Sequence, residues 1–270
     1  MIPQLVVDAW LTNEVEAQVI TLTMSQPYFQ NTFPEGISGA TVQVIRDDGE
    51  IFEFQEAENG QYIWLPEGIG LGEIGNEFGL AIELDGKTYG SLTTLNRVAP
   101  IDSIRTEFRD DEFGFPDGIY AEVFARDLEG PGDMYWIKTF KNGEFLNKPL
   151  EINYAYDAGF SPGANVDGLI FIPPIREGVN RVADSDGDDD NDVAPWDIGD
   201  EIHVEIHSLS LPAFNFLATA ERQMINGLNG IFSEPVINTP GNVVNINDEN
   251  EEVLGIFNVA AVSAMTKVID

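Results

Sequence analysis

A run of nine residues in the C-terminal half carries the most concentrated chemistry of this sequence. Seven of its positions have side chains with acidic or amide oxygens at close spacing, in the order Asp184-Ser185-Asp186-Gly187-Asp188-Asp189-Asp190-Asn191-Asp192. Carboxylates at alternate positions can surround one cation with hard oxygen ligands, which is how calcium loops are built. Without a cation, so many adjacent negative charges repel one another and keep the loop disordered. Both interpretations stay open from the sequence.

The spacing decides which calcium loop this segment could be. An EF-hand loop needs glycine at its sixth position, where this run has Asp189. The Asp-Ser-Asp-Gly-Asp start and the later Asp192 resemble the aspartate repeats of thrombospondin type 3 instead. Those repeats close with an aspartate at position twelve, which is Pro195 here, so that Asp197 comes two residues late. We expect a structural calcium ion whose ligands are Asp184, Asp186, Asp188, Asp190, Asp192 and Asp197.

Both histidines of the chain lie in one short segment, His203 to His207. Isoleucine and valine alternate with them, so the pattern indicates a strand with His203, Glu205 and His207 on its polar face. Residues four apart on a strand are about 13 Å from each other at about 3.3 Å per residue. One zinc ion, with bonds of about 2.1 Å, cannot bind both imidazoles directly. We expect exposed strand residues and no zinc site.

The motifs of the common hydrolases and nucleotide-binding enzymes are missing. The sequence has no G-x-S-x-G and no G-x-x-x-x-G-K-[ST]. With 47 acidic residues, a pair of carboxylates says nothing about a glycosidase. Aromatic pairs at Tyr135-Trp136 and at Tyr154 and Tyr156 could form a platform for a sugar or a peptide, and core packing is the alternative. The prediction is therefore a protein that is not an enzyme.

Charge and composition exclude further classes. The 270 residues contain 47 Asp and Glu against 13 Lys and Arg, a formal charge of −34. Such a field repels phosphate, so we expect no nucleic-acid partner and no basic surface for anionic membranes. The absence of cysteine excludes disulfides and thiolate chemistry. No apolar run reaches the roughly 20 residues of a membrane helix, and no secretion signal precedes the first strand-like run at Leu5. A native start and a removed leader both fit that beginning.

Period-two alternation between apolar and polar residues dominates the chain and predicts a mainly β fold. Turn signals interrupt it at Asp48-Gly49, Asn59-Gly60, Asp85-Gly86 and Asn142-Gly143. About seven short strands precede Pro100, the number of a small sandwich. Later strands are expected at 104–108, 119–125, 134–140, 152–156, 169–172, 201–207, 243–246 and 253–259. We predict two β-sandwich domains, residues 1–98 and 99–270.

One segment has helical spacing instead. Ser210 can cap a helix and Pro212 is allowed in its first turn. Apolar residues then recur three or four apart, which predicts a helix over 211–226 that packs Phe214, Leu217 and Met224 onto the second domain. The second domain is thus expected to carry the Asp-rich loop and one helix.

The order of several short motifs resembles a known family. They are Leu5-Val6-Val7-Asp8-Ala9-Trp10-Leu11-Thr12, Ser25-Gln26-Pro27-Tyr28-Phe29, Ser38-Gly39-Ala40-Thr41-Val42, Gly60-Gln61-Tyr62, Gly86-Lys87-Thr88-Tyr89, Pro100-Ile101-Asp102-Ser103-Ile104, Met134-Tyr135-Trp136, Ser208-Leu209-Ser210, Pro240-Gly241-Asn242-Val243 and Val253-Leu254-Gly255-Ile256-Phe257. Together they resemble domain-of-unknown-function family 4249, surface lipoproteins of Bacteroidota. The resemblance implies an immunoglobulin-like or transthyretin-like first domain. It also implies an outer-membrane protein whose natural precursor is lipid-anchored and often encoded beside a TonB-dependent transporter. It supplies no catalytic residues.

The leading hypothesis is a non-catalytic cell-surface lipoprotein, accessory to a TonB-dependent transporter, that binds a small molecule, glycan or peptide for uptake. An adhesion or structural module stiffened by calcium is the alternative, and a hydrolase with an unrecognised site is a third. Neither the residues nor the resemblance identifies the ligand.

Overall fold

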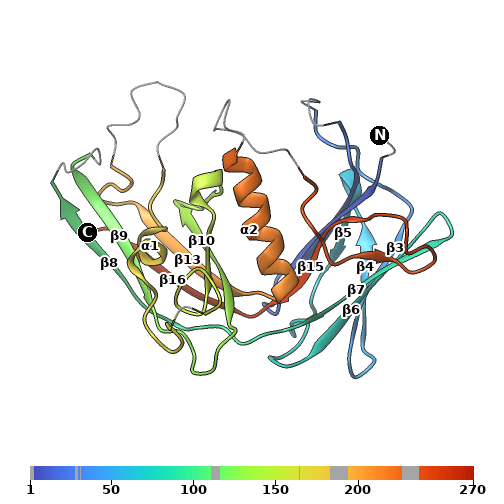
Figure 1. Cartoon of the computed structure of the whole chain (residues 1–270), viewed down its shortest axis with the longest axis horizontal. Helices are drawn as coiled ribbons and strands as arrows, with labels where there is room; N and C mark the ends of the chain where they lie inside the picture. The colour runs from blue at the N-terminus through green and yellow to red at the C-terminus, as the bar shows by residue number, and fades with distance from the viewer. Residues whose placement is uncertain are drawn as a thin grey trace. The chain divides into compact units, whose positions relative to one another are not determined.

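The computed structural model describes residues 3–27, 30, 32–110, 116–163, 165–182, 194–226 and 237–270. The fold is mainly β, as predicted (Figure 1). It divides into two compact units. The first comprises 1–97, 208–223 and 234–261; the second comprises 98–207, 224–233 and 262–270. Residues 208–223 and 234–261, which the division at Pro100 assigns to a second domain, therefore group with the N-terminal part. That residues 1–98 and 99–270 form two β-sandwich domains stays a prediction.

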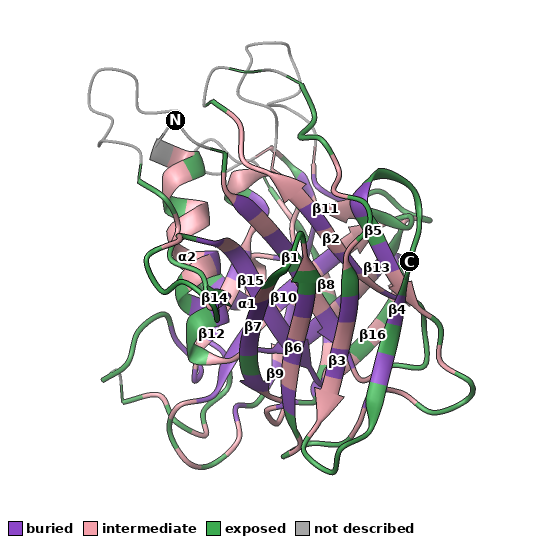
Figure 2. Ribbon diagram, turned by 90° about the vertical axis from the view of Figure 1, so that its right-hand side faces the viewer, coloured by how far each residue is buried: buried purple, intermediate pink, exposed green. Residues whose placement is uncertain are grey.

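A nine-stranded sheet forms the body of the first unit. Its order is β14-β7-β6-β3-β4-β5-β2-β1-β15. The strand bounds are β1 Leu5–Thr12, β2 Gln18–Met24, β3 Thr41–Arg46, β4 Ile51–Glu56, β5 Gln61–Trp64, β6 Glu77–Leu84, β7 Lys87–Thr94, β14 Val244–Asn245 and β15 Leu254–Ala260. A short 3-10 helix, Glu58–Gly60, precedes β5. Buried and exposed positions alternate along β3, β4 and β6 (Figure 2), as expected for strands with one face on a core.

Turn residues that were identified in the sequence form hairpins in the structure. Asp85 and Gly86 both have positive φ, and they connect Leu84 to its cross-strand partner Lys87 in a two-residue turn. Asn142 and Gly143 do the same between β10 and β11. Two-residue hairpin turns of type I′ need this conformation at both central positions, which explains the Asp-Gly and Asn-Gly pairs.

The sheet of the first unit curls until its two ends approach each other. Asn96, just beyond β7, forms an isolated parallel bridge with Ala260 in β15. The side chain of Asn242 bonds both backbone groups of Phe257, donating from Nδ2 to the carbonyl and accepting the amide N–H at Oδ1, each at 2.8 Å. One side-chain amide thus replaces a strand partner for β15, because it carries both a donor and an acceptor.

Helix α2, Leu211–Asn226, follows the predicted bounds. Ser210 caps it, with its Oγ accepting the N–H of Ala213 at 3.4 Å. Phe214 and Leu217 are buried as expected, and Phe216 packs edge-on against Trp10 of β1 at 6.2 Å between ring centroids. Two expectations were wrong: Met224 is exposed, and residues 211–223 belong to the first unit. Helical spacing marks an apolar flank but not the surface that covers it.

The described residues of the second unit form two sheets with an apolar core. Strands β8 (Ile101–Arg109) and β9 (Gly118–Ala125) form one sheet. The other has the order β11-β10-β13-β16, with β12 also paired to β10. Its bounds are β10 Met134–Lys141, β11 Glu144–Leu146, β12 Asn153–Tyr156, β13 Glu201–Ser208 and β16 Val262–Val268. Ala121 and Val123 from β9 share one core with Ile137 from β10 and Val204 from β13.

A short helix, α1 (Pro173–Glu177), and a 3-10 turn, Pro149–Glu151, also belong to the second unit. The predicted strand at 169–172 was wrong, since only Ile170 forms an isolated bridge, with Arg126. The two prolines directly after Ile172 occupy the first turn of α1, a position that suits their fixed φ and missing N–H.

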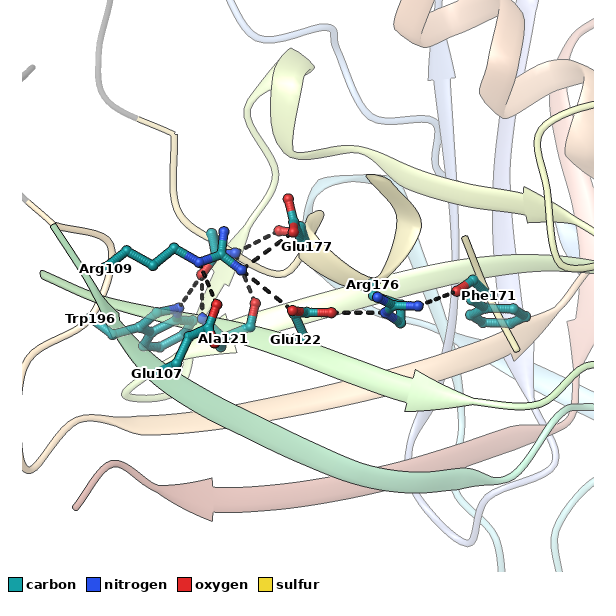
Figure 3. Close-up of polar contacts among 9 residues, drawn as sticks. Glu107, Arg109, Ala121, Glu122, Phe171, Arg176, Glu177 and Trp196 are labelled. Carbon is teal, nitrogen blue, oxygen red and sulfur yellow. Dashed lines mark hydrogen bonds and ion pairs between the residues drawn. The ribbon is translucent and has the colours of Figure 1, made fainter. Parts of the chain in front are cut away.

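Ion pairs tie α1 to β8 and β9 (Figure 3). Glu122 of β9 accepts hydrogen bonds from Nε of Arg176 at 2.8 Å and from Nη2 of Arg109 at 3.3 Å. Arg109 also pairs with Glu107 and Glu177. Because the guanidinium groups of this network are partly exposed, their contribution is to position α1 more than to stabilise the unit.

Among the described helices, none has the length and apolar content that would let it cross a membrane.

Candidate functional site

The sheet of β10 and β13 carries polar and aromatic side chains on the face opposite its core. Tyr135 and Ile137 of β10 are buried in the core, and so are Ile202, Val204 and Ile206 of β13. The alternate residues therefore lie on the other face. We call this surface the histidine–aromatic face: Trp136, Lys138, Phe140, Phe145, Tyr154, His203, Glu205 and His207.

The rings of this face lie in contact across neighbouring strands. Phe140 is 5.1 Å from Phe145 and 5.6 Å from His203, measured between ring centroids. Trp136 is 6.2 Å from Phe145 and 6.5 Å from His207. Such spacings are typical of tilted and edge-to-face aromatic pairs. Two cross-strand rows result, each with a histidine at the β13 end.

Glu205 links the two rows. Nε2 of His203 is 3.1 Å from Glu205 Oε1, and Nε2 of His207 is 2.7 Å from Glu205 Oε2. An ionised carboxylate only accepts, so each imidazole donates its Nε2–H. Nδ1 of His203 then accepts the hydroxyl of Thr266 on β16 at 2.7 Å. This bonding fixes the tautomer of His203 and the orientation of both rings.

The environment of Glu205 and His207 shifts the pKa of each group. The hydrogen bond from His207 lowers the pKa of Glu205 from its ordinary value to about 2, although burial opposes the shift. Burial lowers the pKa of His207, against the hydrogen bond to Glu205, which raises it. Lys138 adds its positive field to both effects, and its Nζ lies 4.3 Å from the centroid of Trp136. At neutral pH the face thus carries an ionised glutamate and a neutral His207.

Part of this site was visible in the sequence and part was not. The shared face of His203, Glu205 and His207 was predicted correctly, but the expectation that both histidines are exposed was wrong, because His207 is buried. Tyr135 lies in the core, whereas Trp136 and Tyr154 are cross-strand partners on the histidine–aromatic face. The alternation of a strand puts neighbours such as Tyr135 and Trp136 on opposite faces, but only the pairing of β10 with β11, β12 and β13 brings the rings together.

A second acidic cluster lies in loops of the same unit. Carboxylate oxygens of Asp127, Asp157 and Asp167 all lie within 4.8 Å of one another. Oδ1 of Asp127 accepts the hydroxyl of Tyr135 at 2.7 Å, and Oδ1 of Asp157 accepts the amides of Gly132 and Asp133 at 2.7 and 3.0 Å. The sequence gave no indication of this cluster, because its three aspartates are far apart along the chain.

Burial raises the pKa of Asp127, and the charges of Asp133 and Asp157 raise it further, while the bonds from Tyr135 and Gly168 lower it. Oxygen ligands of this kind suit a hard cation. Yet the same three carboxylates accept the backbone N–H groups of Gly130, Gly132 and Gly168. These bonds connect the loops around residues 127–133 and 167–168 and account for the arrangement without a cation.

Five of the predicted calcium ligands, Asp184, Asp186, Asp188, Asp190 and Asp192, lie outside the described residues. The sixth, Asp197, is exposed, and its N–H donates to Oδ2 of Asp200 at 2.9 Å. Hydrogen bonds fix the chain on both sides of the Asp-rich segment. The N–H of Val182 donates to Glu151 at 3.0 Å, and the buried Trp196 donates from Nε1 to Asn180 at 3.0 Å.

The model of the family described as "Domain of unknown function (DUF4249)" matches residues 2–266, nearly the whole chain. No curated protein matches the sequence. The match covers both units, including the strands of the histidine–aromatic face. The chain therefore belongs to the DUF4249 family.

Proposed function

We propose that the protein is a non-catalytic cell-surface lipoprotein whose ligand binds at the histidine–aromatic face. The observation that carries this proposal is the grouping of Trp136, Phe140 and Phe145 around the pair His203 and His207 that Glu205 bridges. Aromatic faces beside fixed hydrogen-bonding groups suit glycans, peptides and small ring-containing molecules, since each ligand has both apolar faces and polar edges.

The same geometry favours binding over catalysis. A general base works best when its pKa lies near the operating pH. Glu205, with a pKa of about 2 and both oxygens occupied by imidazoles, is far from that condition. The Nε2 atoms of both histidines are likewise engaged. A pre-organised set of donors, acceptors and rings serves recognition without proton transfer.

The cellular role that we propose comes from the family resemblance. The protein would be lipid-anchored in its natural precursor on the extracellular face of the outer membrane, accessory to a TonB-dependent transporter in nutrient uptake. The net charge of −34 supports the exclusion of nucleic-acid partners. A structural calcium ion in the Asp-rich segment completes the proposal.

A binding assay on the full chain tests the proposed site. Glycan and peptide arrays supply candidate ligands, and calorimetry measures affinity for wild type, Trp136→Ala and Phe140→Ala. Loss of a stacked ring should weaken binding about tenfold or more. Phe33→Ala is the control, because Phe33 is fully exposed and lies in the other unit. Equal affinity in wild type and both ring variants would refute the site.

The accessory role needs a separate measurement. The tagged full-length precursor would be purified from native outer membranes in mild detergent. Stoichiometric co-elution with a TonB-dependent transporter is the expected result. Co-elution with adhesins or matrix components instead would favour the alternative, a calcium-stiffened structural module. The held ends of the Asp-rich segment, at Val182 and Trp196, are the observation that favours that alternative.

A further inference from the structure

The outer face of β3, β4, β6 and β7 carries a stripe of apolar residues in the first unit. Four directly paired positions run across these strands, because Ile51 pairs with Ile45, Ile45 with Gly79, and Gly79 with Leu92. Paired residues of antiparallel strands share a face. The opposite face holds the core residues Val44, Phe52 and Phe78, so the stripe points away from the core.

The edge strand β14 extends this stripe. Val244 pairs with Gly90, and the N–H of Ile246 donates to the carbonyl of Thr88 at 2.8 Å. Gly90 and Leu92 are alternate residues of β7, which places Val244, Ile246 and Leu92 on one face. We call Ile51, Ile45, Leu92, Val244 and Ile246, with the glycines between them, the apolar stripe.

Two glycines flatten this surface. Leu92 lies over Gly79, and its Cδ2 is 3.5 Å from where a Cβ added to Gly79 would lie. Ile246 lies over Gly90 in the same way, with its Cδ1 2.9 Å from an added Cβ. These aliphatic side chains contact the backbone of the glycines, yet the stripe stays exposed. The exposed fraction is 80% for Leu92, 62% for Ile246, 57% for Val244 and 52% for Ile51. A contiguous apolar patch of this kind marks an interaction surface more often than scattered single residues do.

The charges around the stripe have one sign. Outward positions of β4 and β6 carry Glu53, Glu77 and Glu83, all exposed. The two cations of these strands, Arg46 and Lys87, have the parity of the inward face and are paired with Asp48 and Glu251, respectively, at 2.6 Å. Within the described strands, the apolar stripe is thus bordered by three carboxylates and by no outward lysine or arginine.

We propose that the apolar stripe is a docking surface for a protein partner whose own contact patch is aliphatic at its centre and rimmed by lysine or arginine. Apolar contact gives affinity, and opposite rims give orientation and a fast encounter. A second copy would place Glu53, Glu77 and Glu83 against the same carboxylates, and an anionic lipid surface would meet the same repulsion. Charge complementarity therefore selects a cationic partner.

Peptides of defined chemistry test the inference on the full chain. The probe is a fluorescent amphipathic helix with a leucine stripe flanked by lysines. A glutamate-flanked version and a scrambled version of the lysine peptide are the comparisons. The lysine peptide should bind at least about tenfold more tightly than either one, and its affinity should fall with salt.

Variants locate the binding. Leu92→Ser with Ile246→Ser should weaken it about tenfold, whereas Leu65→Ser with Ile69→Ser, equally exposed aliphatics off the stripe, should leave it within about twofold. Glu53→Gln with Glu83→Gln should weaken it less and reduce its salt dependence. All these positions are exposed, so circular dichroism should show unchanged folding.

Four outcomes would overturn the proposal. The first two are no binding of the lysine peptide to wild type at about 1 mM and equal affinity for the lysine peptide and its scrambled version. The third is an equal loss of affinity in the two double-serine variants. The fourth is a wild-type dimer in light scattering that Leu92→Ser with Ile246→Ser converts to a monomer. The last result would assign the stripe to a second copy of this chain.

Discussion

Glu205 accepts a hydrogen bond from each histidine of the chain, one at each carboxylate oxygen. An amide in its place has an oxygen at only one of these two positions and an NH₂ donor at the other. We expect Glu205→Gln to lower the free energy of unfolding at pH 7 by about 1–3 kcal/mol, because one imidazole would face an NH₂ group and the ionic character of both bonds would be lost. Urea unfolding measures this. Glu53→Gln, on an exposed outward position, should change stability by less than about 0.5 kcal/mol. Equal midpoints for the two variants would contradict the bridging role.

The pH dependence of stability gives a second test at the same residues. Burial holds the pKa of His207 below its ordinary value of 6.5, so the unfolded chain binds a proton there before the folded chain does. Stability should therefore fall as pH drops below about 6.5. Glu205 has its pKa lowered from 4.5 to about 2, so it is ionised in both states above pH 5.5 and adds its loss only under more acidic conditions.

His207→Phe separates the two contributions. Between pH 8 and pH 5.5, wild type should lose more unfolding free energy than this variant, as measured by urea titrations at each pH, since phenylalanine does not titrate. Parallel pH profiles for wild type and His207→Phe over that window would show that His207 is not held neutral by the fold.

At the scale of elements, the parallel pairing of β1 with β15 depends on a glycine. Gly255 has a φ of +101° and pairs with Val7, whose carbonyl oxygen lies 1.9 Å from the position of an added Cβ. Gly255→Ala should destabilise the protein by about 2 kcal/mol or more, from backbone strain and displacement of the strand. Gly49→Ala is the matched control: its φ is +89°, but its Cβ would meet nothing within 4 Å. Thermal unfolding should show the larger loss for Gly255→Ala, and equal losses would mean that the close approach has no cost.

Helix α2 is held by its buried flank. Leu217 is buried, whereas Leu211 in the first turn of the same helix is exposed. Leu217→Ala should cost about 2–5 kcal/mol through lost contacts and the cavity left behind. Leu211→Ala removes the same atoms from an exposed site and should cost less than about 1 kcal/mol. An unchanged urea midpoint for Leu217→Ala would show that the helix is not anchored there.

At the scale of the whole molecule, 47 acidic residues make stability sensitive to cations. We expect calcium to raise the melting temperature, because binding to the folded state alone contributes about 2.7 kcal/mol at a hundredfold excess over Kd. Melting curves with calcium and with chelator measure the shift, which Asp186→Ala with Asp188→Ala should abolish. Asp157→Asn, in the other acidic cluster, should leave it in place. If Asp157→Asn removes the shift and the double alanine variant keeps it, the ion is bound at Asp127, Asp157 and Asp167 instead.

The amino-acid sequence by itself determined the local features of this protein. Alternation indicated most of the strands and their inward faces, because side chains of a strand point to opposite sides with a period of two. The strand predicted at 169–172 was the exception. Asp85-Gly86 and Asn142-Gly143 fixed two hairpins through their positive φ. Ser210 and the apolar spacing after it fixed helix α2. Each depends on interactions within a few residues, which is why a single sequence suffices.

Only the tertiary structure decided which distant segments share a surface. Nothing local indicates that β15 pairs with β1, that Asn242 bonds the backbone of Phe257, or that residues 211–223 join the first unit. The sequence also does not indicate which side chains form the two proposed binding surfaces. Phe145 contacts Trp136 beside the histidines that Glu205 bridges, and Leu92 lies beside Ile246, only because of how the strands pair. Strand pairing is non-local, since its energy comes from contacts made after the chain has closed long loops, and sequence periodicity describes the faces of a strand without its neighbours.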